Sequence, residues 1–185
     1  TATYTAAGVT GTADSASVTL DGVAAGADLQ LAGAVETITL NVTSDSAFAD
    51  LVFDAGTTTL NVDAGADLTV ATTLTGTGVT SVTITGSGDV TLTPDLGTAV
   101  ATVSAGAATG AIDIDSGAVN EATNASATFD EFDLTITTGS GGDTVDLSQT
   151  VTGREMSVDV GAGDDTVVIG SALVAATATA AGDVL

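Results

Sequence analysis

The chain has 185 residues, a length that fits one domain with a core of useful size. Its 24 acidic residues and single basic residue give a formal net charge of −23, which excludes ordinary binding to nucleic-acid phosphates and disfavours anionic membrane surfaces. Histidine and cysteine are absent, so disulfides, thiolate metal sites and the usual general bases are excluded. Such a charge favours cations as partners, although an acidic surface can also serve solubility alone.

We expect one β-helical domain over residues 1–185, beginning with an N-terminal cap or strand that includes a strand-like piece at Ser17–Leu20. Because the first residue is Thr1 and not Met, we expect a mature product or part of a longer chain. No apolar run is long enough to predict a membrane-spanning segment. The expected parts are 1–27 (cap or strand), 28–115 (regular coils), 116–131 (loop insertion), 132–171 (coils with calcium turns) and 172–185 (cap or linker).

Hydrophobic pairs separated by one residue recur along the chain, and the steps 68→90→112→134→156 are all 22 residues. Two such pairs in each period predict stacked coils. The expected fold is therefore an all-β, right-handed parallel β-helix or β-roll with coils of about 22 residues, with a β-sandwich as the alternative. The first predicted column contains Leu51–Phe53, Leu68–Val70, Val90–Leu92, Ile112–Ile114, Leu134–Ile136 and Met156–Val158; the second contains Ile38, Leu60, Val82, Val145 and Val167.

Two irregularities interrupt this period. The step from Leu51 to Leu68 is only 17 residues, although Leu29 to Leu51 is again 22. Residues 116–131 lack a hydrophobic pair where one is due, which indicates a loop insertion that Phe129 and Phe132 would hold against the core. Between the columns, clusters of Gly and Asp predict tight turns between short strands.

Two segments share the pattern G-x-G-x-D followed by a hydrophobic residue, and they lie 22 residues apart, at 139 and 161. The pattern resembles the haemolysin-type calcium-binding (RTX) repeats of secreted bacterial proteins. The resemblance covers residues 138–168 and departs from the nonapeptide at its first glycine, which is Thr138 in one copy and Val160 in the other. It implies a Ca²⁺ site with ligands from Gly139, Gly141, Asp143, Gly161, Gly163, Asp164 and Asp165.

A third segment, Gly86–Asp89, carries its Asp one place too early to be counted as a site. The Thr- and Ala-rich repeats that precede these motifs are similar in composition and rhythm to bacterial surface-layer and RTX adhesin proteins. That resemblance implies a secreted structural protein of the bacterial cell surface, assembling with copies of itself into an S-layer, filament or adhesin. Cell-surface polysaccharide or lipopolysaccharide is a further expected partner, whereas nucleic acid and membrane insertion are not.

Little in the sequence supports catalysis, so we expect no enzyme and no catalytic residues. Acid pairs such as Asp113/Asp115 and Asp130/Asp133 are more typical of turn caps than of a hydrolase. Arg154 is expected to neutralise neighbouring acids. A polysaccharide-binding or polysaccharide-active β-helix is the alternative function. A remoter one is ice binding through the hydroxyl rows Thr37/Thr39, Thr59/Asn61 and Ser81/Thr83.

Overall fold

The computed structural model describes residues 2–5, 11, 13–33, 35–76, 78–94, 96, 99–116, 134–148 and 156–170. Their strands form an eight-stranded sheet of the odd-numbered strands and a seven-stranded sheet of the even-numbered strands. In chain order the strands are β1 (Ala2–Thr5), β2 (Ser15–Asp21), β3 (Ala27–Ala32), β4 (Thr37–Ser44), β5 (Ser46–Phe53), β6 (Thr59–Ala64), β7 (Leu68–Thr75), β8 (Ser81–Gly86), β9 (Val90–Leu92), β10 (Thr102–Ala108), β11 (Ile112–Asp115), β12 (Leu134–Thr137), β13 (Thr144–Leu147), β14 (Met156–Asp159) and β15 (Thr166–Ile169).

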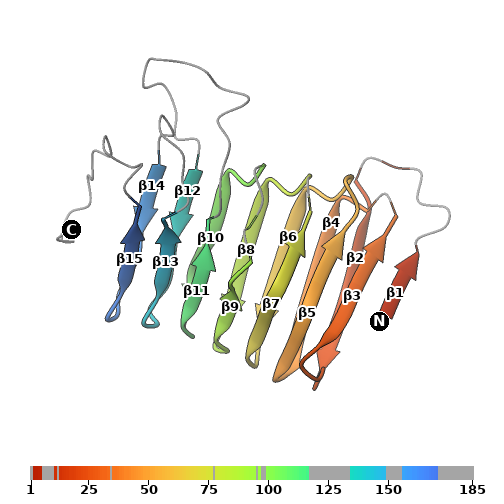
Figure 1. Ribbon diagram of the computed structural model, residues 1–185, viewed down its shortest axis with the longest axis horizontal. Coiled ribbons are helices and arrows are strands. Elements are labelled where there is room, and N and C mark those ends of the chain that lie inside the picture. Colours follow the sequence, from red (N-terminus) through yellow and green to blue (C-terminus); the bar gives the residue numbers. More distant parts are fainter. Residues whose placement is uncertain are drawn as a thin grey trace, which may run out of the picture.

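The chain alternates between the two sheets, so each coil contributes one even-numbered strand and then one odd-numbered strand (Figure 1). Neighbouring strands within each sheet come from successive coils and run parallel, as in β4, β6 and β8. The parallel β-helix with coils of about 22 residues is thereby confirmed. The alternative β-sandwich is wrong, because hairpin-connected strands would be antiparallel and neighbours in the same sheet.

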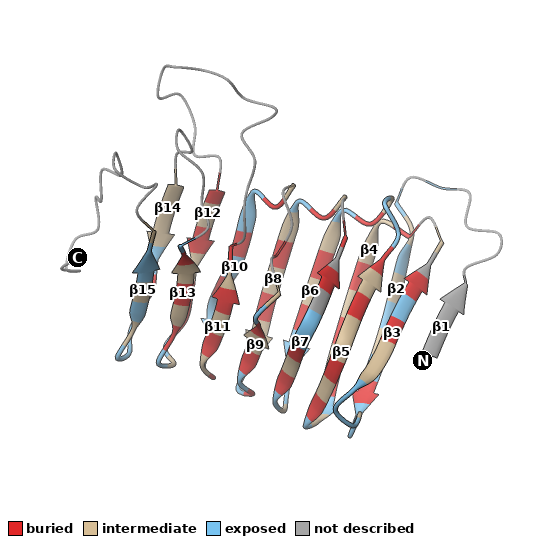
Figure 2. Ribbon diagram, viewed as in Figure 1, coloured by how far each residue is buried: buried red, intermediate tan, exposed pale blue. Residues whose placement is uncertain are grey.

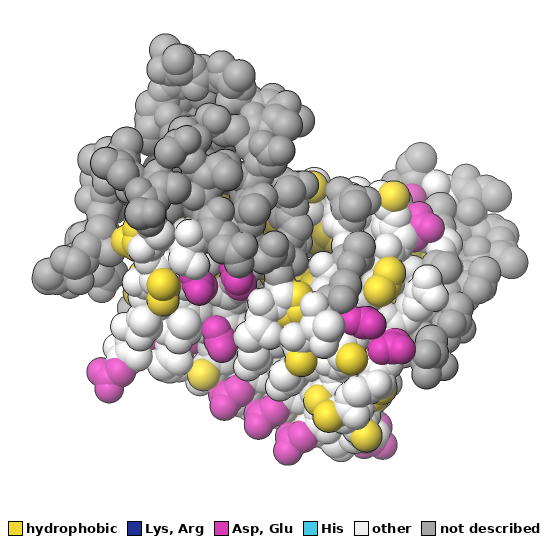
Figure 3. Space-filling view, in the orientation of Figure 1, with side chains coloured by type: hydrophobic (Ala, Val, Ile, Leu, Met, Phe, Trp, Pro, Cys, Tyr) yellow, Lys and Arg dark blue, Asp and Glu magenta, His cyan; other side chains and the backbone are white. Residues whose placement is uncertain are grey.

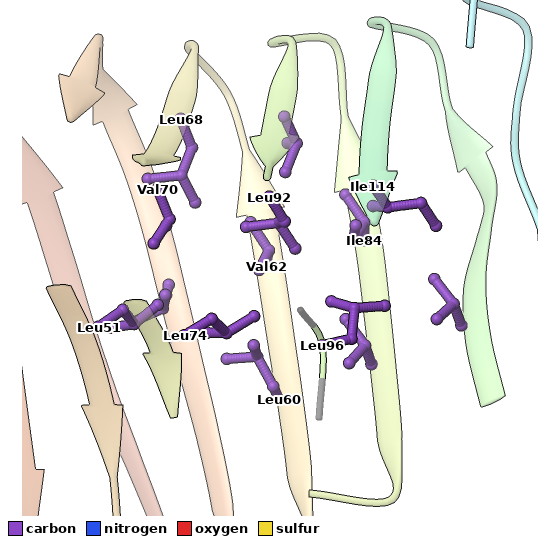
Figure 4. Close-up of a cluster of buried hydrophobic side chains, with 14 of the residues drawn as sticks. Leu51, Leu60, Val62, Leu68, Val70, Leu74, Ile84, Leu92, Leu96 and Ile114 are labelled. Atoms are coloured by element: carbon purple, nitrogen blue, oxygen red, sulfur yellow. The ribbon is translucent and has the colours of Figure 1, made fainter. Parts of the chain in front are cut away.

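The core lies between the two sheets and is made by alternate residues of each strand. In β4, Ile38, Leu40 and Val42 are 2% exposed or less, whereas Thr39 and Asn41 between them are only partly buried. This period of two follows from strand geometry, which turns successive side chains to opposite faces. Figure 2 shows the resulting bands of buried residues, and Figure 4 shows Leu60, Ile84 and Leu92 among the side chains that fill the interior.

The short predicted step between Leu51 and Leu68 disappears in the structure. Leu68 aligns with Ser46, not with Leu51, and the step between these two is again one full coil. Leu51 aligns with Leu29 on one side and with Leu74 on the other. The prediction was wrong because an inward position of the column is occupied by a polar residue: Ser46 is buried, and its hydroxyl donates to the carbonyl of Ser44 (2.8 Å).

The predicted columns also exchange sheets after Ile114. Leu134–Ile136 and Met156–Val158 were assigned to the column of Ile112–Ile114, but they lie in the other sheet, where Ile136 follows Val82 and Val103. Conversely, Val145 and Val167 continue the column of Ile114. The coil that contains residues 116–131 is longer than the others. Its length makes the 22-residue step from 112 to 134 join positions that are not structurally equivalent.

Strand β2 pairs with β4 in the register of the later coils, so the stack extends further toward the N-terminus than residue 28. The strand-like piece at Ser17–Leu20 lies within β2. The remaining predictions concern segments and side chains outside the described residues: the insertion after Ser116, Phe129, Phe132, Asp130, Asp133, Arg154 and the cap or linker over 172–185.

Replacing a core residue in the middle of the stack should lower stability far more than replacing its outward neighbour. Ile84 is completely buried, so Ile84→Ala should lower the free energy of unfolding by about 2–5 kcal/mol. Thr83→Ala, on the outer face of the same strand, should cost less than about 1 kcal/mol. Urea denaturation followed by circular dichroism measures both, and equal losses would contradict the assignment of the inner face.

Candidate functional site

Acidic side chains gather at the corners, the turns that lead from each even-numbered strand to the next odd-numbered strand. Figure 3 shows several of them following one another along the lower edge of the molecule. In the N-terminal half they are Asp45, Asp67 and Asp89, all exposed and one coil apart. Because neighbouring strands lie about 4.8 Å apart, these carboxylates repeat at about that spacing.

Each of these three carboxylates accepts a hydrogen bond from the next coil. The N–H of Asp67 donates to Oδ1 of Asp45 (3.3 Å), and the N–H of Asp89 donates to Oδ1 of Asp67 (2.9 Å). The N–H of Ala111 then donates to Oδ1 of Asp89 (2.8 Å). The carboxylates thus satisfy amide groups at the turns, where the backbone ladder of the sheets is interrupted.

Asp143 and Asp165 accept hydrogen bonds from the preceding coil and not from the following one. Oδ1 of Asp143 accepts from Ile112 N–H in the preceding coil (2.8 Å), and Oδ1 of Asp165 accepts from Asp143 N–H (2.9 Å). The two series meet at two consecutive residues: the N–H of Ala111 donates to Asp89, and the N–H of Ile112 donates to Asp143. The structure therefore brings Asp143 and Asp165 one coil apart, as the sequence predicted.

Asp143 differs from the outward acids because it occupies a core position. It follows Leu68, Val90 and Ile112 in the inward column, and it is 1% exposed. Its Oδ1 is satisfied, but its Oδ2 is buried without a hydrogen-bond partner among the described residues. A buried carboxylate oxygen without a partner is costly, so a water molecule or a cation beside it would lower that cost.

The four predicted glycines stack in pairs across the same corner. A Cβ on Gly161 would lie 2.0 Å from the carbonyl oxygen of Gly139, and one on Gly163 would lie 1.8 Å from that of Gly141. Gly161 and Gly163 also adopt positive φ angles of 72° and 148°. Only glycine tolerates both conditions, so the two turns pack closely against each other, and the carbonyl oxygen of Gly139 accepts a hydrogen bond from the N–H of Ala162 (2.9 Å).

The chemistry of this corner fits a hard cation such as Ca²⁺, which takes carboxylate and backbone carbonyl oxygens. The anionic ligand would be Oδ2 of Asp143, with neutral oxygens from the glycine turns. Asp164 is exposed and Asp165 is half-buried, with its Oδ1 already bonded to an amide. Over the described residues, no three acidic side chains converge as a ready-made metal cluster.

Sequence reasoning placed Asp67 and Asp89 in turns but did not connect Asp45, Asp67 and Asp89 into one series of corner acids. Their signal is present in the sequence as an Asp that recurs every 22 residues, at 45, 67 and 89. The structure also explains why Gly86–Asp89 is not a copy of the later motif. Asp89 is exposed one position before the inward Val90, whereas Asp143 itself occupies the inward position.

Among the described residues, no helix is long and apolar enough to cross a membrane. The fold and the corner define the class as a parallel β-solenoid with acidic corners. Comparisons with protein-family models, curated proteins and solved structures found no match. The function of this chain must therefore be inferred from the chemistry of its own residues.

Substitutions at Asp89 can separate the contribution of the corner hydrogen bond to stability from that of the corner charge. Asp89→Asn keeps an acceptor oxygen for the Ala111 N–H, whereas Asp89→Ala removes it. The Ala variant should be less stable than the Asn variant by about 0.5–1.5 kcal/mol in chemical denaturation. Asp63→Ala, which removes an exposed acid that makes no hydrogen bond to the described residues, is the control and should leave stability nearly unchanged. Equal stability of Asp89→Asn and Asp89→Ala would rule out this role for the carboxylate.

Proposed function

We propose that the protein is a structural component of the bacterial cell surface, a calcium-stabilised β-solenoid of an S-layer, extracellular filament or adhesin. The observation that best supports this proposal is the buried Asp143, whose Oδ2 has no partner among the described residues. Ca²⁺ would supply that partner, and its binding would be coupled to the ordering of the C-terminal coils.

The charge of the chain supports the same proposal. In-register stacking places carboxylates on carboxylates at the corners, and two unit charges about 4 Å apart repel by about 1 kcal/mol even in bulk water. With a net charge of −23, the chain has almost no basic side chains to offset this repulsion. A cation bound at Asp143 would offset this repulsion in the C-terminal coils, so the stability of those coils should depend on divalent ions as well as on the core.

The fold suits a structural role. It is a repetitive stack of parallel coils. The side chains of Asp113 and Asp115 are half-buried on β11, and the chain has no histidine, cysteine or lysine to assist catalysis there. Within the described residues, the exposed large hydrophobic side chains are Val168 (39%) and Ile169 (41%), both on the terminal strand β15. An apolar edge strand supports association with a further strand, such as that of another copy.

Removing calcium should loosen the C-terminal coils, and weakening Asp143 should raise the calcium concentration needed to order them. Asp143→Asn retains an acceptor for Ile112 N–H but removes the anionic oxygen, so the calcium midpoint in circular dichroism should rise by about tenfold or more. Asp165→Asn should raise it less, because Asp165 is more exposed.

Asp89→Asn is the matched control, since it removes an equal charge from an outward corner position and should leave the midpoint nearly unchanged. Particle size should be followed in the same titration. If EGTA changes neither secondary structure nor assembly, the calcium proposal fails.

A second candidate function, polysaccharide binding, is favoured by the outer face of the even-numbered sheet. Seven hydroxyl side chains form one straight row across all its strands, and none of them hydrogen-bonds to a described residue. Hydroxyl groups without protein partners can exchange hydrogen bonds with the hydroxyl groups of a neutral glycan. The row consists of Ser15, Thr37, Thr59, Ser81, Thr102, Thr135 and Ser157.

This second candidate predicts that the protein sediments with an insoluble neutral glucan such as cellulose and that Thr59→Lys, in the middle of the row, weakens the binding severalfold. Thr91→Lys, on the outer face of the other sheet, is the control and should leave the binding intact. Absence of sedimentation would contradict the candidate. Thermal hysteresis that Thr59→Lys abolishes would instead assign the hydroxyl row to ice.

A further inference from the structure

The interior of the coil formed by β12 and β13 contains a second buried polar atom without a partner, the hydroxyl oxygen of Thr138. Thr138 is 2% exposed, and its Oγ1 has no hydrogen-bond partner among the described residues. Asp143, with its unpartnered Oδ2, lies at the other end of the same turn. Two buried polar atoms without a partner among the described residues therefore flank one turn.

Thr138 occupies an inward position that apolar residues fill in the neighbouring coils. Register places Thr137 between Ser104 and Asp159, so Thr138 follows Ala105 and precedes Val160 in an inward column. Ala105 and Val160 are both buried and apolar, at 0% and 6% exposure. Thr138 therefore introduces an oxygen into a column that is apolar in the coils on either side.

The other buried polar side chains of the described residues are satisfied. Thr57 donates to the carbonyl of Val35 (2.9 Å), Ser46 donates to that of Ser44, and Ser116 also has a partner. A third buried atom without a partner, Oδ1 of Asp50, belongs to a residue that is only half-buried. The fully buried side chains with an unsatisfied atom are thus Thr138 and Asp143, on one coil and at one corner.

The turn that forms this corner contains fewer residues in this coil than in the preceding one. Five residue steps separate Thr138 from Asp143, whereas seven separate the equivalent positions Ala105 and Ile112 in the preceding coil. Gly139 makes the shorter path possible, because a Cβ there would lie 2.0 Å from the carbonyl oxygen of Ala108. The shortened turn holds the two inward side chains at opposite ends of one tight corner.

We infer that Thr138 Oγ1 is a ligand of the cation that Asp143 binds, so that the ion lies on the inner side of the corner and not between exposed turns. This inference rests on the proposed calcium-dependent function. A hydroxyl oxygen is a neutral hard donor of the kind that Ca²⁺ accepts beside a carboxylate, and its lone pairs serve the ion without adding charge. No hydrogen bond joins the two atoms, so each lacks a partner among the described residues.

The test compares Thr138→Val with Thr138→Ser in titrations with Ca²⁺ and with Mg²⁺, followed by calorimetry and circular dichroism. Valine keeps the shape and removes the oxygen, so the Ca²⁺ midpoint should rise by about three- to tenfold. Serine keeps the hydroxyl group and should restore the midpoint of the unmodified protein. Thr57→Val is the matched control, because it removes a buried hydroxyl that already has a partner and should lower stability without moving the Ca²⁺ midpoint.

The outcomes separate this inference from the proposed function. If Asp143→Asn raises the midpoint and Thr138→Val leaves it unchanged, calcium binds without Thr138 and the inference is wrong. If Thr138→Val destabilises the protein equally in Ca²⁺ and in EGTA, the hydroxyl holds a water molecule or has a packing role only, and the inference is again wrong. If no variant and no chelator changes folding, the proposed function itself fails.

Discussion

The in-register stacking of parallel coils is the constraint on which the other features of this molecule depend. In the middle of the stack, as in β4, β6 and β8, a strand pairs with equivalent positions one coil before and one coil after. A side chain there lies directly over its counterparts at a spacing of about 4.8 Å. Ile38, Leu60 and Val82 form a core column for this reason. The same constraint places acids over acids at the corners and hydroxyl groups over hydroxyl groups on the outer face. Side chains of one type therefore form continuous rows along the stack.

For the acids this arrangement has opposite effects. Their repulsion disfavours the stack, but their oxygens accept amide hydrogen bonds across it, as Asp67 does from Asp89. For outward acids, both the repulsion and the hydrogen bonds are weakened by the surrounding water. At Asp143 the carboxylate enters the apolar interior, where an unsatisfied oxygen costs more, and this cost is the basis of the proposed cation site. The transition from outward Asp89 to inward Asp143 distinguishes the C-terminal coils from the earlier ones.

The architecture and half of the candidate site could be predicted from sequence because repetition is directly visible. The 22-residue step predicted stacked coils and correctly placed Asp143 one coil before Asp165. It assigned Leu134 and Val145 to the wrong sheets, because the long coil after Ile114 contributes a hydrophobic pair that falls in step by coincidence. Ser46 and Thr138 were missed because a hydrophobic pattern does not detect polar side chains at inward positions. Whether such a residue has a partner depends on packing between coils, which sequence spacing does not determine.

Hydrogen–deuterium exchange, resolved by segment and compared in Ca²⁺ and EGTA, tests the central claim most directly. If calcium orders the coils around Asp143, its removal should accelerate exchange in β12 to β15 by an order of magnitude or more, with little change in β4 to β8. The account is contradicted if exchange is unaffected by EGTA, or if it accelerates equally along the whole stack, because the ions would then act through general screening of charge and not at one corner.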